Sequence, residues 1–220
     1  MSTQQAALEN LRVIRSLMEK AHIYRAISAS AALMGGGLSV IGFVLCSQPK
    51  GASMRTEEFL AVWLTILAIT GSMNLFLLAR EAQKRGQPFV SDGMRAAFRA
   101  LVPPLLVGGV LGIGLVVWSH AYAMAALIWI LCYGLALLST ASFSPRSLIR
   151  LGWSFVISGL VLFCLWAGSD GDARLIPFNK GVIGDEGVAG FAMAATFGLL
   201  HIGYGIAVLV SKKPEPLPAE

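Results

Sequence analysis

Charged residues are scarce in this sequence, and they are unevenly spread. Only 13% of its 220 residues are Asp, Glu, Lys or Arg, and five long tracts contain none of the four. A helix needs about 20 mostly apolar residues to cross a hydrocarbon core about 30 Å thick, so each tract is long enough for at least one crossing. Such a composition leaves no room for a soluble domain over most of the chain. The uncharged tracts are residues 26–49, 59–79, 100–145, 151–169 and 187–211.

The longest tract, 100–145, has the length of two crossings and a polar interruption. Trp118-Ser119-His120 lies near its middle and indicates a tight turn with an interfacial tryptophan. Lipid offers no hydrogen-bond partners to open backbone groups, so helices are the structure expected here. The sequence therefore predicts an all-α polytopic membrane protein, a bundle of six transmembrane helices with an N-terminal cytoplasmic amphipathic helix. The predicted spans are about 26–46, 59–79, 101–117, 121–140, 148–168 and 188–210.

Cysteine is also scarce, and its three copies fall in three different predicted spans. No paired spacing joins them, which argues against a zinc site or a disulfide framework. Cys46 and Cys164 both lie toward the outer ends of their spans, so a bridge between them is the alternative. We favour the simpler interpretation, in which the cysteines are small buried apolar residues. The sequence predicts no metal site.

The basic residues predict how the chain is oriented. With the N-terminus in the cytoplasm, thirteen basic residues fall on inner segments and four on outer segments. This bias follows the positive-inside rule and predicts a multi-pass protein of the bacterial inner membrane with both termini cytoplasmic. The net charge of +5 is then a topology signal, and nucleic-acid binding is not needed to explain it. The inner residues are Arg12, Arg15, Lys20, Arg25, Arg80, Lys84, Arg85, Arg95, Arg99, Arg146, Arg150, Lys212 and Lys213, and the outer ones are Lys50, Arg55, Arg174 and Lys180.

The chain is predicted to have three parts. Residues 1–22 form a cytoplasmic amphipathic helix, because apolar residues from Leu8 to Ala21 recur at helical spacing. That helix lies on the inner leaflet or, as the alternative, docks a partner. Residues 23–211 form the six-helix transmembrane domain. Residues 212–220, which contain three prolines, are predicted to be a disordered cytoplasmic tail.

Three arginines are predicted to contact lipid head groups. Arg25 precedes the first span, and Arg95 and Arg99 lie four residues apart just before the third. Residues four apart share a helix face, so the latter pair can approach the membrane surface together.

Small residues at four-residue spacing predict close helix packing. Because lipid tails are as apolar as leucine, transmembrane helices associate through close backbone approach and polar links. The third span carries one such pair and the sixth carries a longer stripe, which also favours contact with other membrane proteins. These packing residues are Gly108, Gly112, Gly190, Ala194 and Gly198.

No predicted span carries a charged residue away from its ends. Proton- and ion-coupled carriers keep an acid or base within the membrane, so that class is disfavoured. The sequence also lacks a Walker motif, a His-Glu-x-x-His pair and a dinucleotide-binding glycine motif. It predicts no catalytic residue, and therefore a protein that is not an enzyme.

The polar residues inside the spans are the remaining candidates. His201 and Tyr204 share a face of the sixth span, and a mid-membrane histidine can ligate haem, contact a quinone or bond to a neighbouring helix. We favour the last of these and keep cofactor binding by the two residues as an alternative. Asn74, Ser28 and Ser30 are candidates for a substrate pathway.

Three functional hypotheses result. The favoured one is a non-catalytic accessory or scaffold subunit of a bacterial inner-membrane assembly, with the lipid bilayer and other membrane proteins as partners. The second is a small-solute channel or carrier for an uncharged substrate, in which a gap near Gly35-Gly36-Gly37, Asn74 and His201 would form the route. For the three glycines themselves we favour ordinary helix packing over a loosened first helix. The third is a haem- or quinone-associated redox subunit centred on His201.

Overall fold

The computed structural model describes residues 5, 8–14, 29–47, 54–84, 86, 92–168 and 184–211. Within these ranges the chain is helical and has no strand, which confirms the predicted all-α class. The elements are α2 (Ala29–Cys46), α3 (Thr56–Lys84), α4 (Asp92–Ser119), α5 (Tyr122–Ser139), the 3-10 turn η1 (Ala141–Phe143), α6 (Arg146–Gly168), α7 (Asp185–Met193), the π turn η2 (Ala194–Gly198) and α8 (Leu199–Ser211).

Six crossings are present, as predicted. Across the ranges just given, six helices are long and apolar enough to span a membrane, and the last consists of α7, η2 and α8 in one run. The uncharged tract 100–145 divides where Trp118-Ser119-His120 predicted a turn. There α4 ends at Ser119, and His120 adopts a left-handed backbone with φ of 50° before α5 begins. The chain is therefore a multi-pass membrane protein with six candidate spans in its described part.

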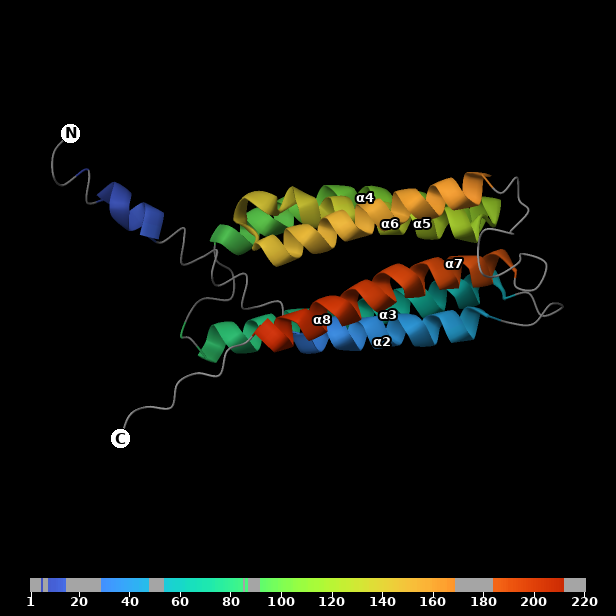
Figure 1. Ribbon diagram of the computed structural model, residues 1–220, viewed down its shortest axis with the longest axis horizontal. Helices are drawn as coiled ribbons and strands as arrows, with labels where there is room; N and C mark the ends of the chain where they lie inside the picture. Colours follow the sequence, from blue (N-terminus) through green and yellow to red (C-terminus); the bar gives the residue numbers. More distant parts are fainter. Residues whose placement is uncertain are drawn as a thin grey trace.

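The helices form two layers. In Figure 1, α4, α5 and α6 lie in one layer, and α2, α3 and the α7–α8 run lie in the other. The layers are joined mainly where α5 packs against α7, whereas α3 and α4 contact each other only slightly. Helix α2 begins and α8 ends at the same end of the bundle (Figure 1), as six crossings require.

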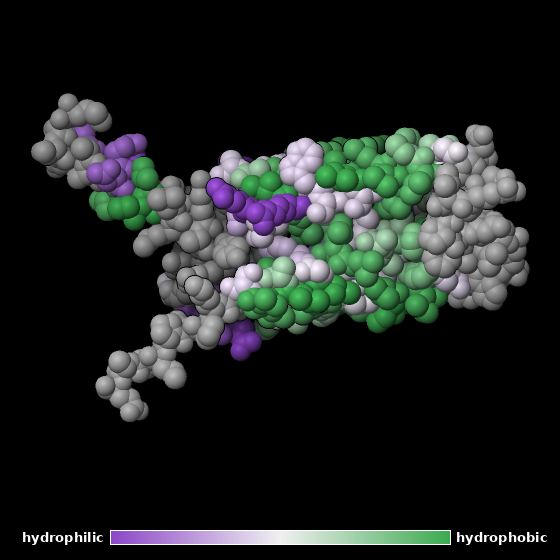
Figure 2. Space-filling view, viewed as in Figure 1, coloured by the Kyte–Doolittle hydropathy of each residue, from purple (hydrophilic) through white to green (hydrophobic). Residues whose placement is uncertain are grey.

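The outer surface of the bundle is apolar. Large side chains such as Val44, Leu67, Leu106 and Val110 are more than 60% exposed. Figure 2 shows apolar residues along most of the visible face, with hydrophilic side chains gathered near the end where α2 begins. In water such a surface would be strongly unfavourable, and it is the surface expected in contact with lipid hydrocarbon.

The glycines predicted to pack helices lie against neighbouring helices of this same chain. An added Cβ at Gly108 would lie 2.6 Å from Cys132 Cβ, and one at Gly112 would overlap the Trp129 indole. On the other layer, an added Cβ at Gly190 would lie 3.0 Å from Cys46 Cβ. Closely approaching backbones gain dispersion contacts that a larger residue would prevent.

The rest of the predicted stripe packs in the same way. An added Cβ at Gly198 would lie 3.2 Å from Val40 Cγ2, and Ala194 is buried. These small residues therefore serve the internal packing of the six helices.

The first span is not broken. Helix α2 continues through Gly35, Gly36 and Gly37 without interruption. Close packing explains two of the three glycines, because an added Cβ would lie 2.6 Å from Thr70 Cγ2 at Gly35 and 2.8 Å from the Gly198 carbonyl at Gly36. The irregular backbone lies instead in η2 of the last crossing.

One end of the bundle, opposite the start of α2, is tied by polar contacts. The Asp185 carboxylate at the start of α7 accepts a hydrogen bond of 3.0 Å from the Ala123 backbone N–H. It thereby satisfies one of the open donors in the first turn of α5, where a negative charge also favours the helix dipole. The Thr56 hydroxyl contacts His120 Nδ1 at 3.2 Å and the Tyr122 hydroxyl at 3.1 Å. These contacts hold the starts of α3, α5 and α7 together.

The predicted N-terminal helix is only partly described. Residues 8–14 are helical, and Arg12 lies 3.9 Å from Glu9. Leu8 and Leu11 are each about 60% exposed within this chain. Several predictions fall outside the described residues: Arg25, Ser28 and the 212–220 tail.

Candidate functional site

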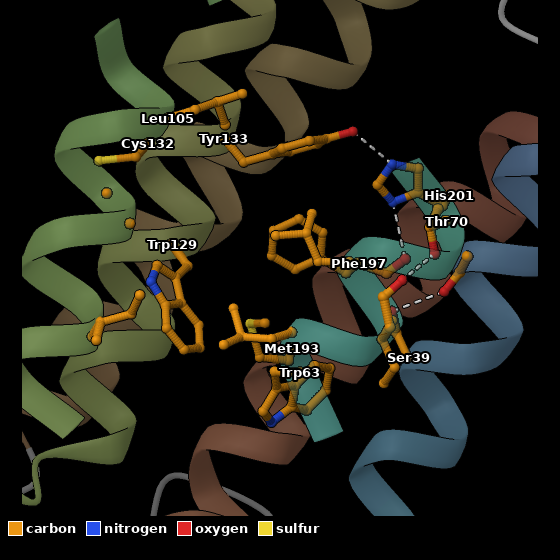
Figure 3. A pocket seen from close by; sticks show the side chains of 17 residues that line it. Ser39, Trp63, Thr70, Leu105, Trp129, Cys132, Tyr133, Met193, Phe197 and His201 are labelled. Atoms are coloured by element: carbon orange, nitrogen blue, oxygen red, sulfur yellow. Dashed lines mark hydrogen bonds between the residues drawn. The ribbon is translucent and has the colours of Figure 1, made fainter. Parts of the chain in front are cut away.

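A pocket of about 270 Å³ lies in the membrane-spanning part of the bundle, between the two layers. Its walls are mostly apolar and aromatic, and residues from all crossings except α6 line it. Figure 3 shows the labelled aromatic side chains Trp63, Trp129 and Phe197 around the space, with Tyr133 and His201 along one side. An apolar cavity with a few polar groups is the usual form of a small-molecule site.

The pocket opens sideways toward lipid. Leu67 on α3 and Leu105 on α4 both line it, yet they are 66% and 43% exposed on the outer surface. The two helices contact each other only slightly, so the space between their side chains reaches the lipid-facing surface. A molecule dissolved in the bilayer can therefore approach without passing through water.

Tyr133 and His201 form the polar centre of the site. The Tyr133 hydroxyl lies 2.9 Å from His201 Nε2, and His201 Nδ1 lies 2.9 Å from the Phe197 carbonyl oxygen. A carbonyl can only accept, so Nδ1 carries the proton and donates to Phe197. Nε2 of the neutral ring is then an acceptor, and Tyr133 donates to it. The neutral form is also the one that a membrane interior favours, since a buried charge there is costly.

Aromatic rings hold this pair in place. The centroid of Phe155, which is fully buried, lies 4.8 Å from that of Tyr133 and 5.3 Å from that of His201. The Phe197 ring stacks on the His201 imidazole with an interplanar angle of 10°. Edge and stacked contacts of this kind favour defined ring orientations. The donor and acceptor atoms of the pair are therefore fixed in direction.

The π turn η2 aligns the residues of the last crossing. Met193, Phe197 and His201 all line the pocket, although eight residues of a regular α-helix leave an offset of about 80° between the first and last. The wider turn at Ala194–Gly198 reduces that offset, so that side chains four residues apart lie above one another. Single π turns of this kind occur often at functional sites.

Two further hydroxyls line the pocket from α2 and α3. Ser39 donates to the Gly35 carbonyl at 2.9 Å, and Thr70 donates to the Ile66 carbonyl at 2.7 Å. Each hydroxyl proton is thus donated within its own helix, and each hydroxyl oxygen keeps lone pairs that can accept a hydrogen bond. Gly35 lets the Thr70 side chain approach α2 closely.

The structure brings only some of the candidate residues to this pocket. His201 lines it, whereas Tyr204 is buried and is not among the lining residues. Asn74 lies one turn beyond Thr70 on α3 and does not line the pocket, and Ser30 is exposed. Arg95 and Arg99 are exposed near the start of α4.

Sequence reasoning missed Tyr133 and Thr70. Both are polar residues inside predicted spans, which is the signal that singled out His201 and Asn74. It also missed Trp63 and Trp129, of which Trp129 lies near the middle of its predicted span and not at the membrane interface.

The structure offers little for metal binding. Among the residues it describes, no group of three or more His, Cys, Asp or Glu side chains could hold an ion. The three cysteines are unpaired, with Cys46 buried and Cys164 exposed.

Comparison with models of known protein families, with curated protein sequences and with solved structures gave no match.

Proposed function

We propose that the protein binds a small lipid-soluble molecule, which enters from the bilayer between α3 and α4. The observation that carries this proposal is the aromatic pocket that opens to lipid beside the Tyr133–His201 pair. Apolar walls with a few convergent polar groups suit a ring system that bears one polar substituent. The role is binding, without catalysis.

The size of the pocket favours a ligand of one or two rings. Its volume of about 270 Å³ is near the lower limit of small-molecule sites, which run from about 300 to 1,000 Å³. A quinone-type ring fits this scale better than haem. Haem iron would also need the Nε2 lone pair of His201, which accepts the Tyr133 proton. Of the redox cofactors considered from the sequence, the geometry therefore supports the quinone class.

The same pocket bears on the other hypotheses. An uncharged-solute carrier would need a route through the membrane, and the unbroken α2 offers less support for one than a broken helix would. An accessory role in a bacterial inner-membrane assembly is compatible with ligand binding. Because the glycine stripes pack within the chain, a protein partner would use another surface, such as residues 8–14 with their exposed leucines.

Filling the pocket tests the proposal. An added Cβ at Gly109, which lines the pocket, meets no atom within 4 Å, so we expect the larger side chain of Gly109→Leu to fill part of the space. Gly203 is equally open but lies on the outside of α8, and Gly203→Leu is the matched control. Purified protein in lipid nanodiscs is titrated with naphthol, and energy transfer from tryptophan reports binding.

We expect saturable binding that weakens by at least about tenfold in Gly109→Leu, a loss of about 1.4 kcal/mol, and stays unchanged in Gly203→Leu. If unsubstituted protein binds no more naphthol than empty nanodiscs take up, or if Gly109→Leu binds as well as the control, the proposal is wrong.

A further inference from the structure

We propose that the pocket selects ligands that donate a hydrogen bond, and that its natural ligand is a neutral phenol, alcohol or hydroquinone. This inference rests on the proposed function and adds the chemical class of the ligand. It follows from the hydrogen bonds that the hydroxyl groups around the pocket already donate within the protein.

The Tyr133 proton is committed to His201. The Phe197 carbonyl fixes the imidazole with its proton on Nδ1, so Nε2 must accept, and the Tyr133 hydroxyl is the group that donates to it. The Tyr133 oxygen keeps a lone pair that can accept from a ligand. A flip of the imidazole would put Cδ2 and Cε1 in the places of the two nitrogens and lose both hydrogen bonds, so the observed orientation is favoured.

The other hydroxyls are committed in the same way. Ser39 and Thr70 donate to carbonyls of their own helices, at 2.9 Å and 2.7 Å respectively. Both oxygens can still accept. Three residues that line the pocket therefore carry hydroxyl oxygens with lone pairs, and none of the three offers a free proton.

The indole N–H groups do not change this balance. Trp63 Nε1 has no hydrogen-bond partner among the described residues, but it is fully buried, so a ligand in the pocket cannot reach it. Trp129 Nε1 lies beside the backbone of α4 at Gly112, on the side of the ring that faces α4 in Figure 3. Cys132 contributes only a thiol, which is a weak donor. A ligand with a hydroxyl group can satisfy the available oxygens, whereas a ligand with only carbonyl groups would place its lone pairs against theirs.

Charge restricts the ligand further. Among the described residues that line the pocket there is no Asp, Glu, Lys or Arg, so an ionised ligand would lose its hydration with no opposite charge in return. Within the quinone class, the reduced form is favoured over the oxidised form, because only the reduced form has hydroxyl protons to donate.

Three probes of similar shape separate these properties. Naphthol donates a hydrogen bond, methylnaphthalene neither donates nor accepts one, and naphthoquinone only accepts. Each is titrated into the full chain in nanodiscs, and its uptake by empty nanodiscs is subtracted. We expect naphthol to bind about tenfold more tightly than methylnaphthalene, the usual worth of one good hydrogen bond, and naphthoquinone to bind most weakly.

His201→Leu supplies a second readout. The substitution releases the Tyr133 proton, so Tyr133 becomes a donor, the affinity for naphthoquinone rises and the advantage of naphthol shrinks. If His201 served only to shape the pocket, affinity for all three probes would fall together. In addition, nitrogen NMR of histidine-labelled unsubstituted protein should show His201 protonated on Nδ1, and this measurement needs no variant.

The outcomes distinguish the two proposals. If naphthol and naphthoquinone bind equally well and saturably, or if His201 is protonated on Nε2, the donor preference is overturned while the binding function stands. If none of the three probes binds saturably, the binding function fails, and the donor preference fails with it.

Discussion

The Tyr133 hydroxyl lies 2.9 Å from Nε2 of His201 and joins α5 to α8 within the membrane-spanning part of the bundle. The two residues are 68 positions apart in the sequence. One hydrogen bond thus connects the two helical layers beside the pocket, and both partners are held by surrounding aromatic rings. It contributes to stability as well as to the polarity of the site.

Loss of this bond should weaken the fold. Tyr133→Phe leaves Nε2 of His201 without a partner, and we expect the free energy of unfolding to fall by about 1 kcal/mol, as for other hydrogen bonds between transmembrane helices. Thermal unfolding of the ligand-free protein in detergent measures it. Tyr122→Phe is the control, because its bond to Thr56 lies at the end of the bundle and is only part-buried. Equal effects of the two substitutions would contradict this account.

Two adjacent glycines of α2 should respond differently to one methyl group. An added Cβ at Gly36 would lie 2.8 Å from the Gly198 carbonyl and 2.6 Å from Ile202 Cγ1, whereas one at Gly37 meets nothing within 4 Å. Gly36→Ala should therefore destabilise the protein by about 1–3 kcal/mol through overpacking, while Gly37→Ala should be tolerated. The yield of folded monomer and the unfolding midpoint measure the difference. A tolerated Gly36→Ala would show that α2 and the last crossing pack less closely than described.

Because Asp185 caps the start of α5, different substitutions of Asp185 should lower the stability by different amounts. Asp185→Ala removes the acceptor of the Ala123 N–H bond and should cost about 1 kcal/mol, the usual loss for a helix cap. Asp185→Asn keeps an oxygen that can accept and should recover most of the stability. Unfolding curves of the three proteins test this order, and equal stability of the alanine and asparagine variants would exclude a capping role.

Membrane orientation remains a prediction from the basic residues. With thirteen of them on inner segments and four on outer ones, the end of the bundle where α2 begins should face the cytoplasm. A reporter that is active only outside the cytoplasm should be inactive when fused after Glu220 and active when inserted into the 169–183 segment. The reverse pattern would invert the topology.

The six crossings could be predicted because hydrophobic length is a local property of the sequence. The uncharged tracts and the Trp118-Ser119-His120 interruption contain the information that divides the chain into its helices. The stripe of Gly190, Ala194 and Gly198 likewise indicates close packing, since small residues permit it wherever the partner helix lies.

The pocket could not be predicted in the same way. Helical spacing pairs His201 with Tyr204 on one face, but the partner of His201 is on another helix, and the spacing of residues along one helix carries no information about which helices are neighbours. The π turn at Ala194–Gly198 lies in an apolar run that is indistinguishable from regular helix by composition. The lateral opening depends on how little α3 and α4 touch, which is a property of the assembled bundle.

Tryptophan quenching shows whether a lipid-soluble ring occupies the pocket beside Trp129. A variant that retains only Trp129 is titrated with bromonaphthol in nanodiscs, alongside a variant that retains only Trp118, which is 83% exposed on the surface. We predict saturable quenching of Trp129 that Gly109→Leu abolishes, and only the linear quenching of lipid partitioning for Trp118. Quenching that is linear and equal for the two tryptophans would contradict binding in the pocket.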